Sequence, residues 1–259
     1  MKDFKKYLSL ATSAAKEAGD YIRSKWEGSF QIEHKGVINL VTEVDKQSEK
    51  MIVEEICKNY PDHDILAEEG TDRRKNSKFR WVIDPLDGTT NFAHGYPAFV
   101  VSIGLEYEGK PIVGVVYDPT REEMFTATKG GGAFLSGKKI FVSKQKKLSD
   151  SLLCTGFGYD VREVLDNNLG EFSKMLKSAQ AIRRDGAAAL DLCYVACGRF
   201  DGFWERGLLP WDMAAGILLI LEAGGQVTAY DGSPFSMADG KILASNALIH
   251  KEISQILTQ

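Results

Sequence analysis

Hydrophobic and polar residues follow a helical period near the start of the chain. Apolar side chains recur every three or four positions over residues 4–22 and again over about 45–60, where Pro61 ends the pattern. This spacing gathers the apolar side chains on one face of a helix. We therefore expect two amphipathic helices, with a loop or hairpin over residues 31–40 between them.

The pattern changes to short β-rich runs between residues 81 and 140. Glu108-Gly109-Lys110 and Ser136-Gly137-Lys138 interrupt these runs in the way that hairpin turns do. Strands joined by such short turns favour a mostly antiparallel sheet. The predicted strands cover residues 81–83, 99–105, 111–117, 123–128 and 133–135.

Helical and strand patterns alternate after residue 150. Strands are predicted over residues 152–155, 201–204, 226–229 and 241–244, and helices over 161–178, 187–197, 211–222 and from 247 onward. Elements in this order stack as layers of helix and sheet. We predict an α/β (α+β) protein with a mostly antiparallel N-terminal sheet over residues 1–146 and a smaller C-terminal sheet over residues 147–259.

Composition restricts the class of protein. The 259 residues carry 32 Lys and Arg against 36 Asp and Glu, a formal charge of −4, and 44% of them are hydrophobic. These values exclude a disordered or collagen-like chain and allow a packed core. The acidic balance disfavours nucleic acid as the main partner. The longest apolar run, residues 213–221, is too short for a membrane helix, and the N-terminus lacks the apolar block of a signal peptide, so we expect a cytoplasmic protein that does not associate with membranes.

The cysteines and histidines do not form a recognisable site. The four cysteines show no paired C-x-x-C spacing, and Cys193 and Cys197 are expected to be buried, reduced thiols. The four histidines are scattered along the chain. Their spacing supports neither a zinc site nor a Ser-His-Asp or Cys-His nucleophile.

The densest chemical signal lies between Trp81 and Phe92. An apolar strand ends at Asp84, a proline turns the chain, and Asp87 follows three residues after Asp84, so that both carboxylates can face one point. Gly88 then allows close approach of the backbone, and the amides that follow can cradle an anion at a helix start. The same residues taken alone also suit a simple capped turn.

Paired carboxylates of this kind favour a cation. Two of them about 4 Å apart repel by about 4 kcal/mol at an effective dielectric near 20. No Lys or Arg occurs between Trp81 and Gly109 to neutralise them. Hard oxygen ligands suit Mg²⁺ or Mn²⁺ better than zinc.

Two further acidic clusters occur elsewhere in the chain. Glu68 and Glu69 follow the apolar pair Ile65-Leu66, at the expected end of a strand, although a solvated acidic loop would look the same. Asp212 stands at the start of an apolar helix, where it can also be a simple N-cap. Three acidic sites with strand-end or turn chemistry are less common than one.

Taken together, these residues resemble the inositol monophosphatase family of magnesium-dependent phosphatases. The similarity spans most of the chain in the family's order, which makes it more specific than any single motif. It rests on Glu68-Glu69 and on residues 84–92, 183–191, 198–205, 211–216 and 222–225. The resemblance implies a layered αβαβα sandwich of the inositol monophosphatase and fructose-1,6-bisphosphatase type, one compact unit whose N-terminal half carries most metal ligands.

The resemblance also implies a set of metal ligands. Glu68, Asp84 and the backbone carbonyl of Leu86 would hold one Mg²⁺, and Asp84, Asp87 and Asp212 a second, with a third, weaker ion near Glu68. Two to three Mg²⁺ per subunit are therefore expected, with Mn²⁺ as a substitute and with Li⁺ and Ca²⁺ as inhibitors. A homodimer is expected on the same ground.

Catalytic and substrate-binding roles follow from the resemblance in the same way. Thr89 with Glu68 would position and deprotonate the attacking water, and Asp87 is counted with them as catalytic. The residues expected to bind substrate are Asp87, Gly88, Thr89, Gly186, Ala187, Ala188, Glu205 and Asp212. Lys35 and Asp45 match positions near a mobile loop of the metal site, although this chain appears one residue shorter between them.

The substrate is expected to be a phosphate monoester. Thr90-Asn91-Phe92 and Glu205 resemble the branch that hydrolyses myo-inositol monophosphates, whereas other branches commonly carry Lys or Arg after Asp-Gly-Thr. Arg184, Asp185 and Gly158 depart from the family pattern and can reshape the alcohol pocket. One alternative is a fructose-1,6-bisphosphatase or a broad sugar-phosphate phosphatase with the same site. A second is a regulatory or binding protein whose phosphatase activity is incidental.

Overall fold

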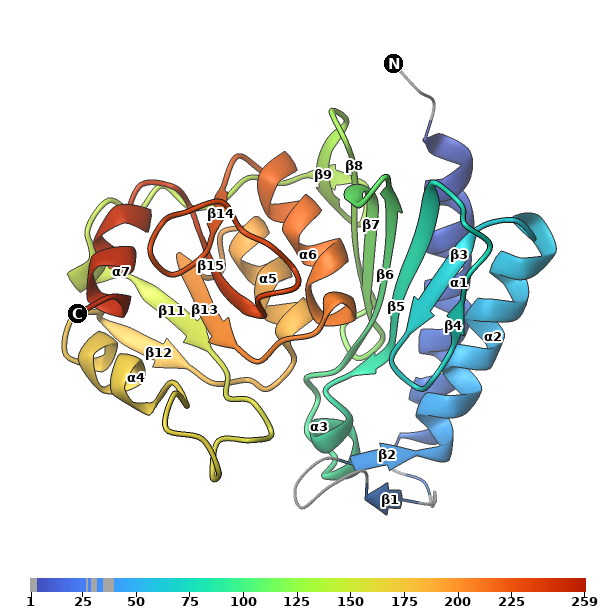
Figure 1. The fold of residues 1–259 in the computed structure, drawn as a ribbon, viewed down its shortest axis with the longest axis horizontal. Helices are drawn as coiled ribbons and strands as arrows, with labels where there is room; N and C mark the ends of the chain where they lie inside the picture. The colour runs from blue at the N-terminus through green and yellow to red at the C-terminus, as the bar shows by residue number, and fades with distance from the viewer. Residues whose placement is uncertain (1–3, 27, 29–31, 35–39) are drawn as a thin grey trace.

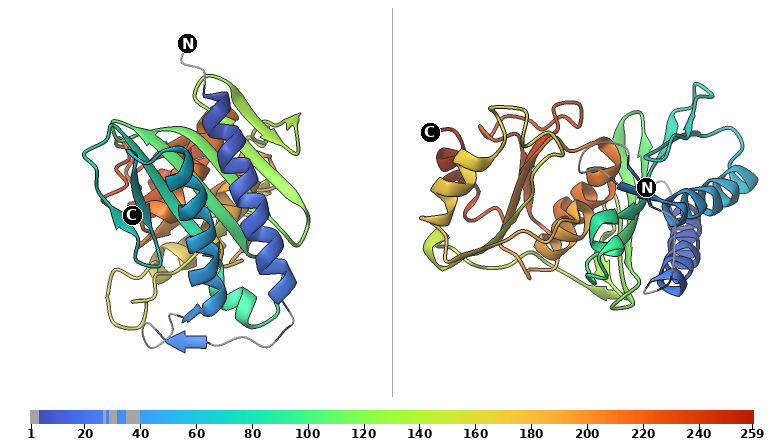
Figure 2. Two further views of the ribbon diagram at one scale, coloured as in Figure 1. Left: turned by 90° about the vertical axis from the view of Figure 1, so that its right-hand side faces the viewer. Right: turned by 90° about the horizontal axis from the view of Figure 1, so that it is seen from below.

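The computed structural model describes residues 4–26, 28, 32–34 and 40–259, and it consists of alternating layers of helix and sheet (Figure 1). Helices α1 (Lys5–Lys25) and α2 (Glu43–Asn59) lie side by side across one face of the larger sheet (Figure 2). Its other face packs against α5 (Ala188–Ala196) and α6 (Pro210–Glu222). A smaller sheet follows, and α4 (Leu169–Leu176) and α7 (His250–Leu257) cover its far side. The predicted αβαβα layering is confirmed.

The larger sheet has eight strands, in the order β10-β9-β8-β7-β6-β5-β3-β4. Every neighbouring pair is antiparallel except β3 and β5, which run parallel. The glycines of the two predicted turns, Gly109 and Gly137, adopt φ angles of 74° and 79°, which such turns require. The strands are β3 (Asp64–Ala67), β4 (Asp72–Arg73), β5 (Phe79–Asp87), β6 (Val100–Tyr107), β7 (Lys110–Asp118), β8 (Glu123–Thr128), β9 (Gly132–Leu135) and β10 (Lys138–Lys139).

The smaller sheet has five strands, in the order β12-β11-β13-β15-β14. Its β11 runs parallel to both neighbours, and the remaining pairs are antiparallel. The bounds are β11 (Leu152–Thr155), β12 (Ala181–Arg183), β13 (Gly202–Arg206), β14 (Gln226–Thr228) and β15 (Lys241–Ser245). A short helix, α3 (Thr89–Ala93), and a hairpin of β1 (Ile32–His34) with β2 (Leu40–Thr42) complete the elements that concern the site.

The largest error of the sequence prediction concerns residues 161–178. Only Leu169–Leu176 is helical, and the chain before it forms turns. Asn168 explains the late start, because it adopts a left-handed φ of 69° and its buried side chain is held by distant partners. Its Nδ2 donates to the carbonyl oxygen of Gly156 at 2.7 Å, and its Oδ1 accepts from Trp204 Nε1 at 2.7 Å.

Helix α6 lies unusually close to the larger sheet because two glycines face it. Gly104 and Gly114 pair with each other across β6 and β7. A Cβ atom on Gly114 would lie 2.7 Å from the carbonyl oxygen of Ala215, and one on Gly104 would lie 2.9 Å from Ala214 Cβ. The missing side chains therefore set how deeply α6 sits on the sheet.

His250 is a buried neutral histidine at the start of α7. It is 3% exposed, and its two ring nitrogens lie 2.8 Å from Thr228 Oγ1 and 2.8 Å from Ser245 Oγ. Burial lowers the pKa of His250 to about 4. The unfolded chain therefore binds a proton at this residue as the pH falls below 6.5, whereas the folded chain does not until the pH nears 4.

This difference predicts that acid removes stability between pH 6.5 and pH 4. We expect His250 to lower the free energy of unfolding by roughly 2 kcal/mol between pH 7 and pH 5. Urea unfolding of the wild type and of His250→Gln over this range measures it, because all other groups titrate in both proteins. A difference between the two proteins that stays constant with pH would contradict the prediction.

Two other expectations meet the structure differently. The four cysteines form no disulfide, and Cys193 is buried as expected, but Cys197 is only half-buried. No helix of the described part of the chain is both long and apolar enough to cross a bilayer. The division of the chain at residues 146 and 147 stays a prediction.

Candidate active site

A cavity of about 290 Å³ collects the acidic residues that the sequence singled out. Glu68, Asp84, Asp87 and Asp212 all line it, together with the backbone that leads into α3. Residues of both sheets contribute to its wall. The structure therefore brings together four carboxyl groups that lie in three separate segments of the chain.

Strand pairing explains why Glu68 and Asp84 meet. Strand β3 runs parallel to β5, with Ala67 opposite Ile83, so the next residue of each strand is an acid. The backbone N–H of Glu68 donates to the carbonyl oxygen of Ile83 at 3.2 Å. Strand β3 ends at Ala67 and β5 continues to Asp87, so the pairing places Glu68, just after β3, beside Asp84 within β5.

Asp212 reaches the cavity from the first turn of α6. The helix begins at Pro210, and Asp212 Oδ2 accepts a hydrogen bond from the backbone N–H of Leu209 at 2.7 Å. Asp212 is therefore not the N-cap, which is Leu209, but the third residue of the helix, where it accepts from the N-cap backbone and also lines the cavity.

Asp87 joins the larger sheet to helix α5 at the site. Its carboxylate is 8% exposed and accepts backbone hydrogen bonds from Ala188 at 3.2 Å and from Ala189 at 2.8 Å, at the start of α5. Asn91 makes a parallel link, since its Nδ2 donates to the carbonyl oxygens of Ala98 and Asp185 at 2.7 and 2.8 Å.

The acids strongly perturb one another's ionisation. Burial, followed by the charges of Glu68, Asp87 and Asp212, raises the pKa of Asp84 well above its ordinary value. Burial raises the pKa of Asp87 to about 7, and burial with neighbouring acids raises the pKa of Asp212. Carboxylates gathered in this way carry negative charge only at a high free-energy cost unless a cation accompanies them.

Thr89 has a partner that the sequence did not pair with it. Its Oγ1 lies 2.8 Å from Asp45 Oδ1 and 3.0 Å from the carbonyl oxygen of Leu86. Asp45 is fully buried and accepts hydrogen bonds from Thr42 in a capping box at the start of α2. The T-x-x-D spacing of that capping box was the available signal, but nothing in it pointed 44 residues ahead to Thr89.

Glycines shape the other end of the cavity. A Cβ on Gly156 would lie 2.2 Å from Glu205 Oε2, so the Glu205 carboxyl rests against bare backbone. Burial raises the pKa of Glu205 to about 8. Gly186 and Ala188 also line the cavity. Ala187 does not line it, because its side chain is buried against Gly88.

Several lining residues were not predicted to take part. Tyr159 and Trp211 were not assigned to the site, and Arg184 was noted only as a departure from the family pattern. Lys35 lies outside the described residues.

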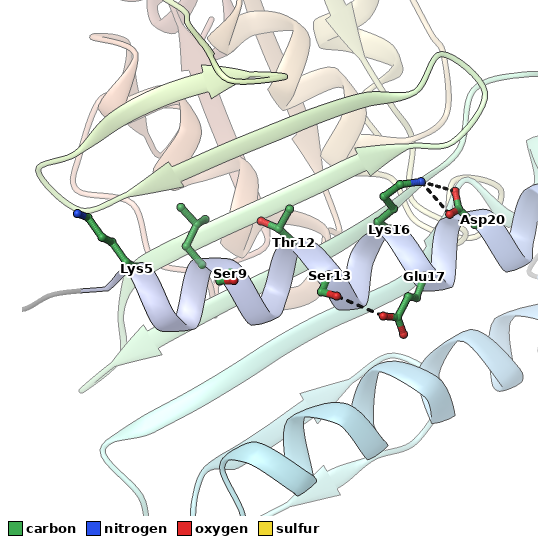
Figure 3. A pocket seen from close by; sticks show the side chains of 8 residues that line it. Lys5, Ser9, Thr12, Ser13, Lys16, Glu17 and Asp20 are labelled. Carbon is green, nitrogen blue, oxygen red and sulfur yellow. Dashed lines mark hydrogen bonds and ion pairs between the residues drawn. The ribbon is translucent and has the colours of Figure 1, made fainter.

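Two other places in the described structure have features of a binding site. Cys154 Sγ and the carboxylates of Asp185 and Asp191 lie within 4.8 Å of one another, but burial raises the pKa of both the thiol and Asp191 well above their ordinary values. Protonated groups favour a hydrogen-bonded pair over a metal site. A groove of about 580 Å³ follows the surface of α1 (Figure 3), where Lys16 pairs with Asp20 within the helix.

Comparisons with known proteins give matches over nearly the whole chain. The inositol monophosphatase family model matches residues 3–259. An inositol-1-monophosphatase of Synechocystis is 52% identical over 257 residues, which cover 98% of this chain and 90% of that protein. A protein of Escherichia coli named Nus factor SuhB is 44% identical over 251 residues, which cover 94% of this chain and 92% of that one.

The fold agrees as well. The solved structure of an inositol monophosphatase from Anabaena superposes with a TM-score of 0.92 at 47% identity, covering 100% of this chain and 97% of that one. Family match, sequence identity and structure coincide over nearly the whole length. The chain therefore belongs to the inositol monophosphatase family, a family of phosphatases.

Proposed function

We propose that the protein is a Mg²⁺-dependent phosphate monoester hydrolase that acts on myo-inositol monophosphates by direct attack of water. The observation that carries the proposal is the convergence of Glu68, Asp84, Asp87 and Asp212 on one cavity. The inositol-1-monophosphatase of Synechocystis supports the substrate, because it shares about half of its residues with this chain. No covalent enzyme intermediate is needed.

The residues at the cavity suit Mg²⁺. The four side chains offer only oxygen ligands, and burial together with neighbouring acids raises the pKa values of Asp84, Asp87 and Asp212, so a cation would favour their charged forms. Glu68, Asp84 and the Leu86 carbonyl would hold one ion, and Asp84, Asp87 and Asp212 another, with a weaker third near Glu68. Bound Mg²⁺ supplies charge neutralisation at the attacking and leaving oxygens and makes bound water more acidic.

Thr89 and Asp45 move the proton of the attacking water. The Thr89 hydroxyl donates to Asp45, which leaves the Thr89 oxygen free to accept a hydrogen bond from a water in the cavity. As water attacks phosphorus, its proton passes to Thr89 while the Thr89 proton passes to Asp45. Glu68 helps to orient the same water. The P–O bond to the alcohol breaks with its electron pair on the alcohol oxygen, which takes a proton from solvent water, and Asp45 then returns its proton to solvent.

The remaining residues hold the substrate. The amides of Gly88 and Thr89, at the start of α3, bind the phosphoryl oxygens together with the ions that Asp87 and Asp212 hold. Gly186, Ala188 and Glu205 line the cavity and would surround the alcohol, whereas the buried Ala187 would support this wall from behind. Because its pKa is about 8, Glu205 is mostly protonated near neutral pH. A protonated carboxyl group can both donate a hydrogen bond to a substrate hydroxyl and accept one from it.

A panel of phosphate esters tests the function. We expect the purified protein to release phosphate from inositol 1-phosphate with Mg²⁺, to work with Mn²⁺, and to lose activity when EDTA removes the metal. Li⁺ and Ca²⁺ should inhibit. Inositol 1-phosphate should have the highest kcat/KM of the neutral-alcohol monoesters. Undiminished turnover in EDTA would contradict the metal assignment, and a faster hydrolysis of unrelated monoesters would contradict the substrate.

The regulatory alternative is supported by the names of some relatives. Proteins of Escherichia coli and Pseudomonas aeruginosa called Nus factor SuhB are 44% and 45% identical to this chain. Glu68→Gln separates the two functions in cells. The variant is expressed in cells that lack the gene. If it is inactive as a phosphatase and fails to restore the wild-type phenotype, the result supports the enzyme. If it is inactive but restores the phenotype fully, the result supports the regulatory role. Sedimentation of the purified protein tests the expected homodimer.

A further inference from the structure

Arg184 brings a positive charge to the alcohol end of the cavity. It is the one cationic side chain among the described residues that line it. The side chain is exposed, and no ion pair or hydrogen bond joins it to another described residue. Its five N–H donors are therefore available to a ligand.

The local backbone holds the guanidinium at this place. A Cβ on Gly186 would lie 2.6 Å from Arg184 Nη1, so the guanidinium folds back over the bare backbone of Gly186. Gly186 has a φ of 81°, which only glycine adopts readily. The turn itself is tied to α3, because Asn91 Nδ2 donates to the carbonyl oxygen of Asp185 at 2.8 Å. The backbone that carries Arg184 is thus anchored next to the site.

Glu205 is the acid of the cavity whose pKa responds to the charge of Arg184, but it offsets that charge only in part. It lies close enough for the Arg184 charge to lower its pKa, but burial outweighs that effect and leaves the pKa at about 8. The two side chains form no ion pair within 4.0 Å in the described structure. Near neutral pH Glu205 is mostly protonated and therefore offsets little of the positive charge of Arg184.

We propose that Arg184 forms an anion subsite, which favours phosphate monoesters whose alcohol carries a second anionic group. The subsite deepens the proposed function and rests on it, since the first phosphate must occupy the acidic end of the cavity. A guanidinium can bind a phosphate or a carboxylate through two parallel hydrogen bonds. The second group would then lie at the mouth of the cavity, over Gly186.

Two matched pairs of substrates isolate the second anion. Fructose 1-phosphate and fructose 1,6-bisphosphate differ only in a second phosphate, and glycerol 3-phosphate and 3-phosphoglycerate differ in a carboxylate. The kcat/KM of each is measured at equal free Mg²⁺ and ionic strength, and fructose 6-phosphate is assayed directly to confirm which ester is cleaved. The ratio within each pair cancels differences in the active fraction of the protein.

Three variants show whether Arg184 sets these ratios. We expect Arg184→Gln to lower the ratio of bisphosphate to monophosphate by about tenfold, because it removes a charged hydrogen bond to the second group. Arg184→Lys should keep part of the ratio, since it keeps the charge but not the planar fork. Arg183→Gln is the matched control, because Arg183 is a neighbouring exposed arginine that does not line the cavity.

The outcomes are distinct. A wild-type ratio above one that falls in Arg184→Gln and not in Arg183→Gln supports the subsite, and the pair that responds more strongly identifies phosphate or carboxylate. A wild-type ratio of one or below, an unchanged ratio in Arg184→Gln, or an equal fall in Arg183→Gln would overturn it. Failure of the proposed function appears separately, as a wild type that hydrolyses none of the monoesters with Mg²⁺.

Discussion

Asp87→Asn is expected to lower kcat/KM for inositol 1-phosphate by about a thousandfold, the order found when one preorganised group is removed from a buried catalytic site. Asparagine keeps the size of the side chain but removes a charge from the group of acids that would hold the cations. It also turns one of the two oxygens that accept from Ala188 and Ala189 into a donor. Both changes act at the junction of α5 with the cavity.

Steady-state kinetics with saturating Mg²⁺ measures this loss, and Mg²⁺ titration by calorimetry shows whether cation binding is lost with it. Asp62→Asn is a suitable control, because Asp62 is exposed after α2 and lies outside the cavity lining. Circular dichroism establishes that each variant is folded. Turnover within a few fold of the wild type in Asp87→Asn would refute the role given to this residue.

Gly114→Ala is expected to lower the free energy of unfolding by about 3 kcal/mol, at the upper end for an overpacked core. The added methyl group would lie 2.7 Å from the carbonyl oxygen and 3.1 Å from the Cα of Ala215. These are backbone atoms of α6, so no side-chain rotation can relieve the contact. The helix must shift, and Asp212 at its first turn shifts with it.

Urea unfolding tests the stability effect, and phosphatase assays at low temperature test the displacement of Asp212. Gly170→Ala is the matched control. A Cβ there would meet no atom within 4 Å, and Gly170 is in helix α4, so alanine should be neutral or raise stability by up to about 1 kcal/mol. Equal effects of the two substitutions would show that the spacing between α6 and the sheet is not set by Gly114.

Much of the larger sheet could be predicted because its information is local. Strands β6, β7 and β8 are each marked by apolar runs, and the turn at Gly109 is marked by its own residues. The same holds for Asp84 and Asp87, which a proline turn places next to each other. By contrast, β4 and β12 have only two and three residues and are defined by their partners, which leaves too short a pattern to read.

Contacts between distant segments account for what the sequence did not reveal. The start of α4 depends on Asn168 and Trp204, and the acceptor of the Thr89 hydroxyl is Asp45, which belongs to another layer. Residues such as Thr89 and Trp204 lie in recognisable sequence motifs. Only the packed layers show which residues they contact.

The hydrogen bonds that join the larger sheet and α3 to α5, α6 and the turn before α5 also bear on how the protein folds. Asp87 reaches Ala188 across 101 positions of the chain, Asn91 reaches Asp185 across 94, and Ser102 reaches Trp211 across 109. Bringing together residues that are so far apart in the sequence costs more chain entropy than pairing two strands that follow each other along the chain. We therefore expect the proposed catalytic centre to be completed late in folding, after the larger sheet has formed, and to lose its geometry when these layers separate.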